Sequence, residues 1–146
     1  MIKSIFKTDY SPKNTDFALL LLRVASGGFM LTHGIGKFSK LLVDDPIEFA
    51  DPIGVGVTAS LALAVFSEVF CAIFLMIGFA TRLAAIPLMI TMFVAGFIVH
   101  ASDGFGKQEL ALLYLVTYFA IAITGAGRFS LDNLIYNKLN HHKTIL

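Results

Sequence analysis

The sequence predicts an all-α protein, a bundle of four transmembrane helices, and three observations support this fold class. The 146 residues are 57% hydrophobic and 14% charged, whereas soluble domains are about 45–50% apolar and about 25% charged. The mean hydropathy is +0.81. Four apolar stretches are each long enough for a membrane-spanning helix, which takes about 20 residues. The strands of a membrane β-barrel would be alternating segments of about ten residues, and the sequence contains none.

The apolar stretches place the four spans in order along the chain, at about 17–36, 55–79, 82–100 and 109–125. The chain should therefore have three parts, which are a cytoplasmic N-terminal tail (1–15), the transmembrane domain (16–127) and a cytoplasmic amphipathic helix with its tail (128–146).

The segment after the fourth span predicts a short helix. Ser130 is a typical N-cap residue, and Asp132 falls in the first turn after it, where an acidic side chain is favourable. The apolar residues that follow recur at helical spacing, which is typical of a helix lying on the membrane surface. They are Leu131, Leu134, Ile135 and Leu139.

The distribution of lysine and arginine predicts the orientation of the bundle. If the spans alternate in direction, seven of these residues lie on the side of the two termini, and only Lys37, Lys40 and Lys107 lie on the other side. Basic residues favour the cytoplasmic side, so both termini should be cytoplasmic. The polar N-terminal segment shows no apolar run with a cleavage site, and we expect the first span to act as an uncleaved insertion signal.

Glu68 is the most informative single residue, because it lies near the centre of the second predicted span. A charge at that depth costs roughly 2.5–3.5 kcal/mol on insertion scales, so the carboxyl group must be neutral, hydrated or paired. Arg23 should lie roughly 5 Å from the midplane and could form a bidentate pair with Glu68. The alternative is that Arg23 extends to the cytoplasmic headgroups.

Several polar residues of the first span are three or four residues apart, which puts them on one helical face directed into the bundle. The residues of this stripe are Arg23, Ser26, Met30, His33 and Lys37. Gly27 and Gly34 adjoin it and allow a neighbouring helix to approach closely.

A second polar group falls at the outer ends of the first, third and fourth spans and could converge on a ligand. Its members are His33, Lys37, His100, Lys107 and Glu109. The alternative is that they are ordinary interfacial residues at helix ends. Glu109 in particular also suits the start of a helix electrostatically, which requires no function.

The composition disfavours several function classes. A net charge of +1 without a basic run predicts no nucleic-acid surface. The single cysteine, Cys71, cannot form an internal disulfide, which excludes a thiol–disulfide relay within this chain. No cluster has metal-ligand spacing, so we expect no metal cofactor. The stretch "GIGKFS" lacks the first glycine and the final serine or threonine of a phosphate-binding loop.

Four segments carry a more specific pattern: "LLRVASGGFMLTHGIGKF", "FSEVFCAIFLMIGFATRLAA", "FVAGFIVH" and "GAGRFSLDNLI". Together they resemble the DoxX family of small four-span bacterial membrane proteins. The resemblance maps the basic residue of span 1 to Arg23, the H-G-x-x-K signature to His33, Gly34 and Lys37, and the acid of span 2 to Glu68. The motif that ends the family pattern maps to Gly125, Gly127, Arg128, Ser130 and Asp132.

The resemblance implies a redox-associated role, because some relatives are subunits linked to thiosulfate:quinone oxidoreduction and others look like partners of redox-stress proteins. It implies a multi-pass protein of the bacterial cytoplasmic (inner) membrane, in contact with the lipid bilayer and with a quinone and a membrane-associated redox protein as candidate partners. It implies no catalytic residue. Two alternatives stay open: a non-enzymatic structural or assembly partner in a membrane complex, and a proton or solute path through Glu68.

Overall fold

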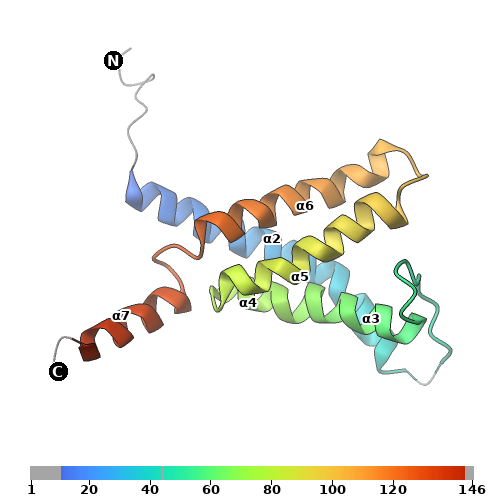
Figure 1. Ribbon diagram of the computed structural model, residues 1–146, viewed down its shortest axis with the longest axis horizontal. Helices are drawn as coiled ribbons and strands as arrows, with labels where there is room; N and C mark the ends of the chain where they lie inside the picture. The colour runs from blue at the N-terminus through green and yellow to red at the C-terminus, as the bar shows by residue number, and fades with distance from the viewer. Residues whose placement is uncertain (1–10, 44, 144–146) are drawn as a thin grey trace, which may run out of the picture.

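The computed structural model describes residues 11–43 and 45–143, and these residues form helices without strands, which confirms the predicted fold class. Four helices are long and apolar enough to cross a membrane. The first is α2 (Pro12–Leu41). The second is one continuous helix made of α3 (Val57–Val65), η1 (Phe66–Cys71) and α4 (Ala72–Ile77). The third joins α5 (Thr81–Val94) and η2 (Ala95–Val99), and the fourth is α6 (Phe105–Thr124). A fifth helix, α7 (Leu131–Lys143), projects from one end of the bundle (Figure 1).

The predicted spans overlap these helices, and three of their ends differ most. The first helix begins at Pro12 and not at residue 17, because Ser11 takes the N-cap position and Pro12 needs no backbone donor in the first turn. It also runs to Leu41, beyond the predicted residue 36. The fourth helix begins at Phe105 and not at residue 109, directly after Gly104. The cytoplasmic placement of both termini stays a prediction.

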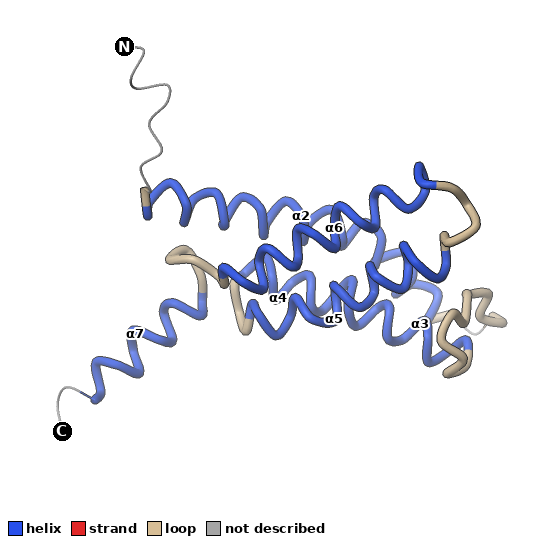
Figure 2. The backbone as a smooth tube through the Cα atoms, turned by 45° about the horizontal axis from the view of Figure 1, so that its top comes forward, coloured by secondary structure: helices blue, strands red, loops and turns tan. Residues whose placement is uncertain are grey.

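The four spans form two antiparallel pairs. The helix α2 packs along α3, η1 and α4, and α5 with η2 packs along α6. The two pairs lie close together near the start of α7 and diverge toward the other end, where residues 42–43, 45–56 and 100–104 form loops (Figures 1 and 2). We call these the α7 end and the loop end of the bundle.

The backbones of two helices approach each other closely at Gly34 of α2. A Cβ atom placed there would lie 2.9 Å from the carbonyl oxygen of Glu68 and 2.7 Å from Cγ2 of Val69, closer than real Cβ atoms come. One at Gly27 would likewise lie 3.0 Å from the carbonyl oxygen of Ala72. The predicted close approach at both glycines is therefore confirmed, and it fixes the register of α2 against its neighbour.

The turn between α4 and α5 joins the two pairs at the α7 end. Gly78 has φ +71°, and the N–H of Phe79 donates to the carbonyl of Phe74 at 2.9 Å, which is a Schellman helix end. Ala80 then has φ +46°, a left-handed conformation that disfavours any residue with a Cβ. Other parts of the chain must hold this turn in place.

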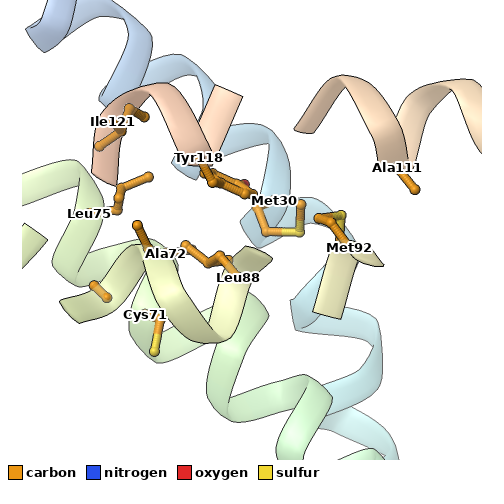
Figure 3. Packing of buried hydrophobic residues seen from close by; sticks show 11 residues of the cluster. Met30, Cys71, Ala72, Leu75, Leu88, Met92, Ala111, Tyr118 and Ile121 are labelled. Atoms are coloured by element: carbon orange, nitrogen blue, oxygen red, sulfur yellow. The ribbon is translucent and has the colours of Figure 1, made fainter. Parts of the chain in front are cut away.

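The apolar core lies where the two pairs meet. Met30, Leu75, Leu88, Tyr118 and Ile121 are almost fully buried and come from all four spans (Figure 3). Large apolar side chains on the outer faces remain exposed in the isolated chain and contact lipid in a bilayer. Since lipid tails are as apolar as the core, the helices pack together through close fit and small residues at their contacts.

The close approach at Gly34 yields a prediction. Gly34→Ala should lower the free energy of unfolding by about 1–3 kcal/mol, because the added methyl group meets backbone atoms that cannot move aside. Gly36→Ala is the matched control, since nothing lies within 4 Å of a Cβ built there. Thermal unfolding in detergent measures both variants, and equal stability of the two would contradict the packing described here.

Candidate ligand-binding site

Glu68 lies in η1 with its side chain 3% exposed, and its partner is Lys37. The Nζ atom of Lys37 donates a hydrogen bond to Oε1 of Glu68 at 2.5 Å. The Lys37 side chain is 30% exposed, so the ammonium group reaches a buried carboxylate from the loop end without being fully desolvated. The pairing follows from the register, because Gly34 faces Glu68 and a helical side chain leans back over the preceding turn.

The expected pair of Arg23 with Glu68 is wrong. Arg23 is fully buried, its Nη2 atom donates to the carbonyl oxygen of Phe129 at 2.6 Å, and Asp132 is the acid that attracts it. Arg23 and Gly34 are 11 residues apart on one continuous helix, which separates Arg23 from Glu68 by roughly 16 Å along the bundle. Because the side chain is buried, it does not reach the headgroups either.

The motif after α6 builds the junction around Arg23. The carboxylate of Asp132 accepts hydrogen bonds from the N–H groups of Ala80 and Thr81, at 2.7 and 2.9 Å, and so holds the strained turn before α5. The hydroxyl of Ser130 accepts from the N–H of Asn133, which confirms the predicted N-cap of α7. Asp132 thus caps a helix other than its own, which sequence analysis missed.

The remaining motif residues tie this junction to α2. Gly125 and Gly127 both have positive φ angles, +82° and +72°, which only glycine adopts readily. The N–H of Arg128 donates to Oδ1 of Asp16 at 3.0 Å, and its guanidinium lies 3.6 Å from Oδ2. The motif therefore serves the α7 end of the bundle and lies away from Glu68.

A cavity of about 500 Å³ lies at the loop end, beside the Lys37–Glu68 pair. Its walls come from α3, η1, α5, η2 and the loop after α2, and they are mostly apolar. Both π-helical segments line it, and such segments are frequent at functional sites. Its size falls within the roughly 300–1,000 Å³ of typical ligand pockets.

A second cavity, of about 170 Å³, lies on the other side of the pair, between α2, α5, η2 and α6. Lys37, Glu68 and His100 line both cavities, so the ion pair forms part of the boundary between them. His33 and Tyr114 line only the smaller one, with their ring centroids 6.4 Å apart in an edge-to-face contact.

The polar groups of the larger cavity differ in their free capacity for hydrogen bonds. The hydroxyl of Ser60 donates to Asp51, and the hydroxyl of Thr91 donates to the carbonyl of Pro87. By contrast, Oγ of Ser67 and Oε2 of Glu68 are buried and without a hydrogen-bond partner among the described residues. Buried polar atoms are rarely left unpaired, so these two are available to a ligand or to water.

The structure brings together most of the predicted ligand-binding residues. His33, Lys37 and His100 line the cavities, whereas Glu109 is exposed and lines neither. Sequence analysis missed Ser67 and Tyr114. Ser67 adjoins Glu68 in the sequence, which was an available signal, but only the packing of α6 reveals Tyr114. Among the described residues, no three His, Cys, Asp or Glu side chains converge as for a metal ion.

The loop before α3 forms part of the lining of the larger cavity at the loop end. Phe49 lies over Lys37, whose Nζ atom is 5.8 Å from the ring centroid, within the range of a cation–π contact. The Asp51 carboxylate holds this loop to α3, because it accepts hydrogen bonds from the hydroxyl of Ser60 and from the N–H groups of Gly56 and Val55. The Ser60 hydroxyl, and then the Gly56 N–H, lower the pKa of Asp51 below its usual value.

Comparison with known proteins agrees with this architecture. The sequence profile of DoxX matches residues 18–101, which include Arg23, the Gly34 contact, the Lys37–Glu68 pair and His100. The chain belongs to the DoxX family. With its four apolar helices, this DoxX protein is a multi-pass membrane protein.

The similar proteins are bacterial. An uncharacterized protein of Haemophilus influenzae is 31% identical over 134 residues, covering 86% of this DoxX chain and 96% of that protein. The Bacillus subtilis protein named "Putative oxidoreductase CatD" is 28% identical over 125 residues, covering 85% and 91%. A second uncharacterized Haemophilus influenzae protein is 36% identical over 77 residues, about half of each chain. No solved structure gives a significant match.

The hydrogen bonds of Asp51 predict a pH dependence of the loop. Because the folded pKa lies below the unfolded value of about 3.9, these bonds stabilise the loop fully above that value, and the stabilisation is lost as the pH falls through the folded pKa. Nuclear magnetic resonance titration of the Val55 and Gly56 amides should show one midpoint below the usual Asp range.

The variants Ser60→Ala and Thr58→Ala test the cause of this shift. Ser60→Ala should raise the midpoint, since it removes the largest contribution to the lowered pKa. Thr58→Ala, an exposed threonine on the same helix, should leave it unchanged. An unchanged midpoint in Ser60→Ala would show that the hydroxyl does not hold the carboxylate.

Proposed function

We propose that this DoxX protein is a redox-associated accessory subunit that binds the head of a quinone or quinol at the Lys37–Glu68 pair. The observation that carries the proposal is a buried carboxylate with one oxygen paired and the other free, at the wall of a mostly apolar cavity of about 500 Å³. Ligand sites are commonly apolar pockets with a few convergent polar groups.

The polar groups fit both forms of such a head. A quinone presents carbonyl oxygens, which need donors, and the ammonium of Lys37 and the hydroxyl of Ser67 supply them. A quinol presents hydroxyl groups, which need acceptors, and the free Oε2 of Glu68 accepts one. Lys37 keeps its hydrogen bond to Oε1 and holds the carboxylate in place for the ligand.

The chemistry of electron transfer must come from outside this chain. A bound quinone would supply the two-electron chemistry that amino-acid side chains lack. The electrons then need a partner protein, for which a membrane-associated redox protein is the proposed class. The name of the Bacillus subtilis relative supports an oxidoreductase context, and the bacterial relatives support a place in the cytoplasmic membrane.

The second candidate function is assembly of a membrane complex without redox chemistry. The observation that favours it is α7, which leaves the bundle and exposes the apolar residues Leu134 (63%) and Leu139 (62%). Exposed apolar side chains on one helix are typical of a surface that lies on a membrane or docks another protein. This function requires no ligand at Glu68, so a ligand assay discriminates between the two.

Thermal unfolding of the purified protein in lipid nanodiscs tests the proposed function. A decyl-substituted benzoquinol at 100 times its dissociation constant should raise the melting temperature of the wild type by roughly 5–10 °C. Glu68→Gln should lose most of this rise, because it replaces the charged acceptor by a neutral amide.

Glu109→Gln is the matched control, since Glu109 is an acid at the same end of the bundle but lines neither cavity. It should respond as the wild type does. If the melting temperature of Glu68→Gln rises by the same amount, the ligand does not bind at Glu68. No rise in the wild type would contradict quinol binding and favour assembly.

A further inference from the structure

The larger cavity has one polar end and one lipid-facing side, and this asymmetry says more about its ligand. We infer that the ligand is an amphiphile with a hydrocarbon chain that enters sideways from the bilayer between α3 and α5. The inference rests on the proposed function for the head of the ligand and adds the chemistry of its tail and its route.

The exposure of the lining residues distinguishes the floor of the cavity from its rim. Glu68 and Ser67 are 2% and 1% exposed and form the floor. Leu63 of α3 and Ile90 of α5 line the same cavity but are 53% and 59% exposed, so they belong to its rim. Both lie on membrane-spanning helices, where the surrounding medium is lipid and not water.

The helix packing explains why the opening lies there. The helix α3 packs against α2 and η1, whereas α5 packs against η1, α4 and α6. Both helices pack against η1, but α3 also follows α2 whereas α5 follows α6, and the two separate toward the loop end (Figure 1). Apolar side chains line the space between them, which leaves a path for a chain of methylene or isoprenoid units.

The side of the cavity that the loop forms is lined by apolar groups. Phe49, Pro52 and Ile53 of the loop line the cavity, and Asp51 fixes that loop to α3. A water-soluble ligand that arrived from this side would meet apolar side chains first. The two atoms without a partner among the described residues, Oγ of Ser67 and Oε2 of Glu68, lie at the floor beside Lys37. An amphiphile whose head meets them leaves its tail along the apolar walls to the rim.

The chain contains no tryptophan, so a single introduced tryptophan reports on the route. The reporters are Leu63→Trp and Ile90→Trp at the rim. The matched control is Leu113→Trp, because Leu113 is 64% exposed and its helix α6 contributes nothing to the larger cavity. Each variant, in nanodiscs, is titrated with a benzoquinol that carries a brominated decyl chain, and the unbrominated compound serves as the blank.

Bromine quenches tryptophan fluorescence only at close range. We therefore expect the quenching at positions 63 and 90 to saturate with ligand concentration. At position 113 the quenching should rise linearly, because there it reports only ligand dissolved in the bilayer. Adding Glu68→Gln should shift the saturation midpoint of the rim reporters about tenfold or more, since the head loses a hydrogen bond to a charged group. If quenching is equal and linear at all three positions while the ligand still raises the melting temperature as in the wild type, the entry route between α3 and α5 is wrong but the site for the ligand head at Glu68 stands. Loss of that rise as well would overturn both.

Discussion

The close approach of α2 to η1 at Gly34 is the contact on which the rest of the structure depends. It lets the backbones of the two helices meet where a side chain would not fit, and it sets the register of the first pair of spans. One consequence is that Lys37 reaches Glu68. The other is that Arg23 lies at the opposite end, against the turn after α4 and the segment before α7.

The two ends of the bundle therefore have different roles. At the α7 end, Asp132 and the carbonyl of Phe129 form a hydrogen-bonded junction that holds a strained turn. At the loop end, the helices diverge, and the carboxylate of Glu68 keeps one oxygen without a partner among the described residues. A junction that joins the two pairs at one end, and diverging helices at the other, suit a protein that holds a ligand head in one place while its tail stays in the bilayer.

The sequence predicts the helices well, because long apolar stretches in a membrane leave few alternatives for the backbone. It also predicts the buried acid and the N-cap at Ser130. It does not predict the partner of Glu68, since Arg23 and Lys37 share one helical face and periodicity favours neither. Only the register selects Lys37, and register comes from contacts between helices. The role of Asp132 was hidden for the same reason, because the helix that it caps is distant in the sequence.

A double-mutant cycle on Glu68 tests this account most directly, with Lys37 and Arg23 as the alternative partners. The changes are Glu68→Gln, Lys37→Met and Arg23→Met, and the measurement is the free energy of unfolding of each single and paired variant. We expect a coupling of about 1–3 kcal/mol between Lys37 and Glu68, and a coupling within about 0.5 kcal/mol of zero between Arg23 and Glu68. Strong coupling of Arg23 to Glu68, with none for Lys37, would contradict the register and the site built on it.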